Sequence, residues 1–129
     1  MALHEDLVIP QGKSWTGPMW ALLAPNDGPY DLTGKVVRAQ VRESPRSQTV
    51  LYEWSTTAGT IAAFTGVVVE MDDGTTVTTS AIALTVKPSV SAAWSWRVGV
   101  YDVEVDEGGD TVWPVVEPSA VRLTLEVTR

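Results

Sequence analysis

The chain contains no cysteine and only one histidine, and these two absences exclude many catalytic and metal-binding chemistries. Without cysteine, its 129 residues can form no disulfide, no thiol nucleophile and no thiolate metal site. Because the one histidine, His4, lies close to the N-terminus, we expect no Ser–His–Asp triad and no multi-histidine zinc site. Basic residues are few as well: 9 Lys and Arg stand against 16 Asp and Glu, which gives a net charge of -7. We therefore expect no nucleic-acid binding, which depends mainly on Lys and Arg.

Long hydrophobic runs and nucleotide-binding motifs are also missing. No apolar stretch approaches the roughly 20 residues that cross a bilayer as a helix, so we expect no membrane span. Residues 1–12 carry acids and lack a basic segment followed by a long apolar stretch, which argues against a secretory signal. The glycines form neither a GxGxxG nor a GxxxxGKS/T pattern. These absences predict a chain that folds in a cytoplasm and is not an enzyme, with no catalytic residues, no cofactor and no metal.

Residues that favour β-strands dominate what is present. Valine occurs 20 times and threonine 15 times, and both are β-branched. Turn-forming residues recur at short intervals, for example at 26–29, 72–74 and 107–110. This spacing is typical of all-β domains. We therefore predict one domain over residues 1–129, an all-β, mainly antiparallel two-sheet β-sandwich of immunoglobulin-like type with about 8–9 strands.

Alternation of apolar and polar residues locates the clearest strands. Residues 35–43 and 120–129 each place apolar side chains on every second position, which predicts half-buried strands. Residues 67–71 and 75–79 flank Asp72-Asp73-Gly74 and predict a hairpin. The inward positions would be Val37, Ala39 and Val41 in the first strand, Val121, Leu123, Leu125 and Val127 in the last, and Ile82, Leu84 and Val86 after the hairpin. Residues 15–23 and 111–116 complete the predicted strands.

Three segments depart from simple alternation. In residues 96–106 the apolar parity changes, which predicts a β-bulge near Val100–Tyr101. Residues 88–94 predict a short helical turn that begins at Pro88 and is capped by Ser89 or Ser91. Residues 1–12 could form an arm that adds a strand to a neighbour, but we favour the alternative in which they hold the first strand of the domain.

Charged side chains gather on the outer faces of two predicted strands. Arg38, Arg42 and Arg46 lie on or just beyond one strand and could meet an acidic neighbour. Asp102, Glu104 and Asp106 share one face of another strand and could meet a basic one. With Glu107 and Asp110 these acids could in principle bind Ca²⁺, but alternating acids are typical of a solvent face and the EF-hand spacing is absent. We therefore predict two charged interfaces and no metal site.

Six tryptophans are many for this length, at positions 15, 20, 54, 94, 96 and 113. Most should be buried in the core, and Trp94 and Trp96 are expected to close one end of it. Trp113 follows a glycine-rich loop, where exposure is expected, so we add it to the candidate interface. Exposed tryptophan can also stack on sugar rings, and Trp113 or Trp54 would be the candidates for glycan binding.

Three stretches together resemble a known family. They are Tyr30-Asp31-Leu32-Thr33-Gly34 followed by Val37 to Arg42, then Ala81-Ile82-Ala83-Leu84-Thr85 followed by Ala93-Trp94, and finally Val100 to Val105 followed by Leu123 to Arg129. This order resembles small β-sandwich minor tail proteins of tailed phages, especially those of actinobacterial hosts. It is also similar to the N-terminal β-sandwich of phage baseplate upper proteins. The resemblance covers about Gly12 to Arg129 and carries no catalytic residue.

The resemblance implies a viral structural protein located in the phage virion. We expect a minor tail or tail-tip protein that docks on other phage structural proteins, and symmetric copies around a tail could form a homo-oligomer. A capsid decoration protein with the same fold is one alternative, and a module that binds host-surface glycan is another. An enzyme that uses only carboxylates is the third.

Overall fold

The computed structural model describes residues 2–127, and within them the chain forms nine strands and one short helix. The all-β prediction is confirmed. The strands are β1 (Leu7–Pro10), β2 (Trp15–Thr16), β3 (Trp20–Ala21), β4 (Val36–Arg42), β5 (Val50–Ser55), β6 (Ile61–Glu70), β7 (Thr76–Val86), β8 (Val98–Gly108) and β9 (Thr111–Thr124). The helix α1 (Pro88–Ala92) lies between β7 and β8.

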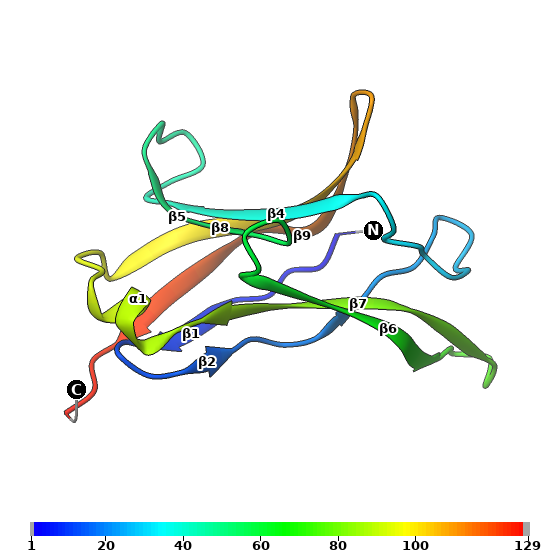
Figure 1. The fold of residues 1–129 in the computed structure, drawn as a ribbon, viewed down its shortest axis with the longest axis horizontal. Helices are drawn as coiled ribbons and strands as arrows, with labels where there is room; N and C mark the ends of the chain where they lie inside the picture. The colour runs from blue at the N-terminus through cyan, green and yellow to red at the C-terminus, as the bar shows by residue number, and fades with distance from the viewer. Residues whose placement is uncertain (1, 128–129) are drawn as a thin grey trace.

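The strands form two sheets. The five-stranded sheet has the order β1-β9-β8-β4-β5, and the four-stranded sheet joins β2, β3 and β6 to β7. All pairs are antiparallel except β1 with β9, which is parallel, so the five-stranded sheet is mixed. Figure 1 shows β4, β5, β8 and β9 in one layer and β6 and β7 in the other.

One hydrophobic core receives side chains from both sheets. As predicted, Val37, Ala39 and Val41 of β4 are buried, and so are Ile82 and Leu84 of β7. Alternate positions of a strand face opposite sides of a sheet, so these residues lie on the inner faces. The other buried members are Leu7, Ile9, Trp20, Leu22, Trp54, Ile61, Val86, Tyr101, Val103, Val105, Val116, Val121 and Leu123.

The N-terminal segment forms a strand of its own domain. Strand β1 pairs with β9 from Leu7, opposite Val121, to Pro10, opposite Thr124. Leu7 and Ile9 are buried, whereas Val8 between them is exposed. Within this chain the segment thus forms the first strand, which is the alternative that the sequence favours.

The last strand ends earlier than the sequence predicts. Strand β9 stops at Thr124, whose partner Pro10 ends β1. Leu125 and Val127, expected inside, are exposed, and Val127 is 99% accessible. Alternation continues in the sequence, but within residues 2–127 no neighbouring strand pairs with Leu125 or Val127. Thr128 and Arg129 lie outside the described residues.

The prediction of a bulge in β8 near Val100–Tyr101 is wrong. Gly99, Tyr101 and Val103 are all buried, so the inward parity of β8 is continuous, and its register with β4 is unbroken from Val100 to Asp106. Because glycine has no side chain, the alternation of apolar side chains does not reveal that Gly99 points inward. A Cβ at Gly99 would stand 2.7 Å from Cγ1 of Val41, which explains why glycine is needed there.

Two of the three register shifts between β8 and β9 are irregularities of β9, and the third lies at the end of β8, where Glu107 is the additional residue. In the pairing of β8 with β9, the register shifts between Tyr101 and Val103 of β8 and again between Val103 and Glu104 of β8. Each of these two shifts leaves an additional residue on β9, close to Pro114 and Pro118. Proline has no N–H for the ladder, so it is confined to edges and bulges such as these.

The helical turn forms where predicted, but the predicted serine cap is wrong. Helix α1 has Pro88 in its first turn and Lys87 at its N-cap, and no side chain of residues 2–127 forms a capping hydrogen bond with it. Ser91 is fully buried instead, and its Oγ accepts a hydrogen bond from the backbone N–H of Gly12 at 2.8 Å. The predicted strand over residues 15–23 is divided into β2 and β3, which flank Gly17 and Pro18. A proline cannot donate to a ladder, so the division falls there.

Two hairpins extend beyond the layered body. The predicted β6–β7 hairpin is confirmed, with the Met71 N–H donating to the Thr75 carbonyl at 2.8 Å. The β8–β9 hairpin leaves the other layer at the top of the view in Figure 1. No helix within residues 2–127 is long and apolar enough to span a membrane.

Candidate docking surfaces

The predicted basic and acidic residues meet on one face of the five-stranded sheet. Strands β4 and β8 are antiparallel neighbours, and their register places Arg38 opposite Glu104 and Gln40 opposite Asp102. Residues directly opposite in a ladder share a face, so these side chains lie together on the outside. The two predicted interfaces are therefore one mixed-charge face, and its role in docking stays a prediction.

Ion pairs join the two sets of charges across this face. The Nη2 atom of Arg38 lies 2.8 Å from Oε1 of Glu104 and 3.6 Å from Oδ2 of Asp106. All three side chains are about one-third exposed or more, so each pair contributes little to stability. Their effect is to neutralise charge locally, so a partner would meet a polar surface of alternating sign.

Arg42 and Arg46 belong to the end of β4 and the loop that follows it. Arg42 donates from Nη1 to the Ser47 carbonyl at 2.7 Å and from Nη2 to Oε1 of Gln40 at 2.8 Å. These bonds hold the loop against the strand. Arg46 is exposed within that loop, just beyond the strand as predicted.

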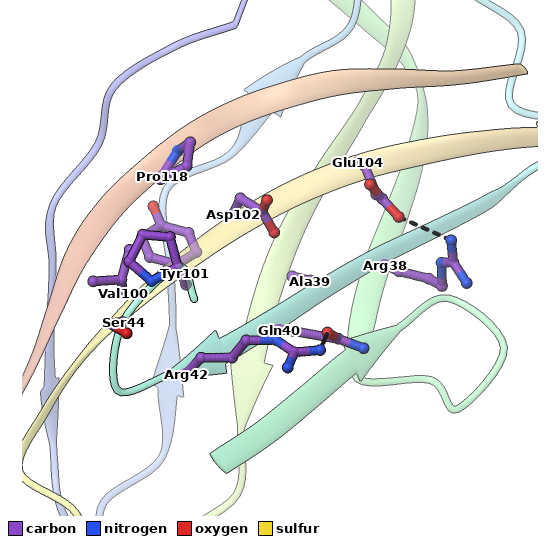
Figure 2. Close-up of a pocket in the computed structure, with 11 residues that line it drawn as sticks. Arg38, Ala39, Gln40, Arg42, Ser44, Val100, Tyr101, Asp102, Glu104 and Pro118 are labelled. Atoms are coloured by element: carbon purple, nitrogen blue, oxygen red, sulfur yellow. Dashed lines mark hydrogen bonds and ion pairs between the residues drawn. The ribbon is translucent and has the colours of Figure 1, made fainter. Parts of the chain in front are cut away.

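A hollow of about 380 Å³ lies between these side chains. Figure 2 shows Asp102 and Arg42 on either side of it, with Ser44 and Pro118 at its rim. Within residues 2–127 Asp102 forms no ion pair. Desolvation raises the pKa of Asp102, and the Glu104 carboxylate raises it further, while Arg42 opposes the shift. Asp102 thus borders the hollow as an exposed carboxylate, outside the ion pairs that Arg38 forms with Glu104 and Asp106.

Trp113 lines a second and more apolar hollow. The side chain is 48% exposed, as the sequence suggested, and belongs to the third residue of β9, close to the turn that joins β8 to β9. The groove has a volume of about 620 Å³ and separates β9 from the chain that follows β3. Its other walls are formed by Leu3, Ala21 to Pro25, Asp27, Tyr30, Val105, Pro114 and Val115. A concave and mostly apolar lining with a few polar groups is typical of binding sites.

A polar network fixes the rim of this groove. The Tyr30 hydroxyl donates to Oε2 of Glu107, and Nζ of Lys35 lies 3.5 Å from the same oxygen and 4.2 Å above the Tyr30 ring. Hydrogen bonds from Tyr30 and Trp113 lower the pKa of Glu107, with Lys35 adding to the effect. Desolvation and Glu107 together raise the pKa of Tyr30 above its ordinary value. The network joins residue 30 to the β8–β9 hairpin, a contact for which the sequence carries no local signal.

Trp54, the other tryptophan considered for glycan binding, is completely buried. Its exposed fraction is 0%, and its indole N–H donates to the Thr85 carbonyl at 3.1 Å. It therefore cannot reach a ligand at the surface. Trp94 and Trp96 pack partly buried against the core with their ring centroids 4.8 Å apart, and the Tyr52 ring contacts Trp94 in a tilted arrangement at 4.9 Å.

The sole histidine lies near a serine and an aspartate, but the group is not a catalytic triad. Nδ1 of His4 is 3.3 Å from Oγ of Ser119, and its Nε2 is 3.0 Å from Oδ1 of Asp6. Ser119 is only 2% exposed, so no substrate can reach its hydroxyl. That hydroxyl donates to the Glu117 carbonyl and accepts from the Glu5 N–H, which ties the N-terminal segment to β9.

Two further findings concern possible ligands and relatives. Among residues 2–127, no three His, Cys, Asp or Glu side chains are close enough together to hold a metal ion. No protein-family model and no curated protein matches the chain.

Proposed function

We propose that the chain is a non-enzymatic structural component of a tailed-phage virion. In this proposal it is a minor tail or tail-tip protein that docks on other phage structural proteins. The sequence resemblance described above supports this role, as does the absence of cysteine, which lets the domain fold under reducing conditions and persist outside the cell.

The fold that belongs to this proposal is an immunoglobulin-like β-sandwich. Support comes from the two sheets, which contribute inward side chains to one shared core. The Trp54 hydrogen bond to Thr85, from β5 to β7, also joins them.

The observation that carries the docking role is the apolar groove beside Trp113. A half-exposed tryptophan beside prolines and aliphatic side chains has the composition of an interface hot spot. Because the Tyr30–Glu107 network already fixes the rim of the groove, the rim would lose little conformational entropy when a partner binds. The mixed-charge face would then supply the polar rim of a wider contact.

Substitution of Trp113 by alanine tests this surface. We expect Trp113→Ala to fold normally and to reduce incorporation of the chain into phage particles at least about tenfold. Quantitative immunoblotting of purified particles gives the measurement. Val98→Ala, at another exposed apolar side chain, is the matched control and should incorporate normally. Normal incorporation of Trp113→Ala would show that the groove is not the docking surface.

Immunogold labelling of the particles locates the protein. Gold confined to the tail supports the proposal, whereas gold distributed over the head favours the alternative of a capsid decoration protein. Complete absence of label from particles that package DNA would overturn the virion role.

Glycan binding is the second candidate function, and only Trp113 now favours it. The exposed indole could stack on a sugar ring. Titration with host cell-wall polysaccharide should then change tryptophan fluorescence in a saturable manner, and Trp113→Ala should abolish the change. A titration without saturation excludes this function.

A further inference from the structure

Strand β6 presents a long edge without a strand partner. It pairs with β7 from Ile61 to Glu70, and within residues 2–127 no strand pairs with its other side. Its 10 residues contain no proline and no basic residue, and Glu70 is the only acid among them. Such an edge exposes a row of backbone donors and acceptors to any strand that approaches.

The other sheet edges are protected in ways that β6 is not. Strand β1 has 4 residues and ends in Pro10, and β2 and β3 have 2 residues each, with Pro18 between them. Strand β5 has 6 residues and carries Glu53 at its centre. Short length, proline and a central charge are usual devices against edge pairing, as are β-bulges; β6 lacks the first three and carries a single bulge.

A bulge divides β6 into two regular halves. The register with β7 shifts between Phe64 and Val67, and it is uninterrupted over residues 61–64 and 67–70. Each half carries an exposed apolar side chain, since Phe64 is 40% and Val68 is 64% accessible. The strand therefore offers two four-residue pairing segments of equal length.

The charge distribution indicates what could approach this edge. Glu70, Asp72 and Asp73 lie together at the turn of the β6–β7 hairpin. At the opposite end of the edge, residues 55–61 and 84–88 contain one charged side chain, the exposed Lys87. A second copy in antiparallel orientation brings its acidic end toward Lys87, whereas a parallel copy would bring two acidic ends together.

We propose that two copies of this chain pair through β6 in antiparallel orientation around a two-fold axis. Residues 61–64 of each copy lie opposite residues 67–70 of the other, and the two bulges meet at the axis. Phe64 then faces Val67 of the second copy, an aromatic and β-branched pair that favours strand association. The two four-stranded sheets become one continuous sheet. This inference concerns the purified chain and is independent of the virion role.

Paired substitutions test the edge and its register. In this arrangement Ala63 lies opposite Val68 of the second copy, and both side chains are exposed in the single chain. Ala63→Lys/Val68→Lys places like charges opposite each other twice per dimer and should weaken self-association at least about tenfold. Ala63→Lys/Val68→Glu places opposite charges there and should retain the dimer. Val98→Lys is the matched control, because Val98 is also 64% accessible.

Sedimentation equilibrium over a range of concentrations gives the readout. We expect the wild type, the Lys/Glu variant and Val98→Lys to reach twice the chain mass of 13.9 kDa, and the Lys/Lys variant to remain at the single mass. A wild type that is monomeric up to its solubility limit overturns the proposal, as does a Lys/Lys variant that dimerises normally. If both double variants are monomeric, the antiparallel register is overturned.

Amide hydrogen exchange separates edge pairing from packing of sheet faces. Edge pairing should slow exchange at alternate β6 amides, those that point away from β7, as concentration rises. A dimer without such alternation would be held by another surface and would overturn the edge-pairing proposal.

Discussion

The carboxylate of Asp102 lies beside the hollow in the five-stranded sheet, flanked by Gln40 and Glu104 and with no ion pair inside residues 2–127. Desolvation and the neighbouring Glu104 raise its pKa above the ordinary 3.8. The folded chain thus binds the proton of this carboxyl more tightly than the unfolded chain does. The stabilisation that comes from this tighter proton binding is complete below pH 3.8 and is lost as the pH rises through the pKa of Asp102 in the folded chain. The ionised carboxylate therefore lowers the stability of the fold at neutral pH.

Replacement of Asp102 by asparagine should therefore stabilise the fold at neutral pH. We expect the Tm of Asp102→Asn to exceed that of the wild type at pH 7 and the gain to shrink at about pH 3, where both forms are uncharged. Differential scanning calorimetry at the two pH values provides the measurement. Glu117→Gln, on the exposed side of β9, removes the same charge and controls for general repulsion. An equal gain in the two variants would contradict a local origin.

At the scale of single strands, the alternation of apolar and polar residues predicts some features of the fold and not others. Strand β4 was predictable almost residue for residue, because Val37, Ala39 and Val41 alternate with long polar side chains. The phase of β8 was not, since its inward Gly99 has no hydrophobic signature. The end of β9 was not either, because it is set by the length of its partner β1. Alternation describes a strand's faces, whereas its limits and bulges depend on the neighbouring strand.

Trp54 anchors strand β5 to the other sheet, and removal of the Trp54 side chain should weaken the whole fold. The Trp54 side chain has no exposed area and its N–H is bonded to Thr85 on β7, so truncation leaves a cavity and an unpaired carbonyl. We expect Trp54→Ala to lower the free energy of unfolding by about 3–5 kcal/mol. Urea denaturation followed by circular dichroism measures the loss. Trp113→Ala should lose only about 1 kcal/mol or less, and similar losses in the two variants would contradict this assignment of burial.

At the scale of the whole molecule, sequence reveals which charges exist but not which ones meet. Residues 1–64 carry a net charge of -1 and residues 65–129 one of -6, an asymmetry that suggests two separate surfaces. Antiparallel pairing of β4 with β8 instead interleaves the two halves, and Arg38 neutralises Glu104. The apolar groove is equally inaccessible to sequence reasoning, since it assembles Leu3, Tyr30 and Trp113 from distant parts of the chain. Only Trp113 among them carried a local signal, its place after a glycine-rich turn.

The parallel pairing of β1 with β9 also orders the events of folding. Glu5, just before β1, and Ser119 on β9 are hydrogen-bonded across a separation of 114 residues. During synthesis the strands β2, β3, β6 and β7 can complete their sheet once Val86 has left the ribosome, whereas β1 must wait for β9. Contacts so distant in sequence slow the search for the native state. Strand β1 precedes the other strands in the chain and cannot pair in this sheet until β9 has been made, so its apolar residues lack their native partner for most of translation.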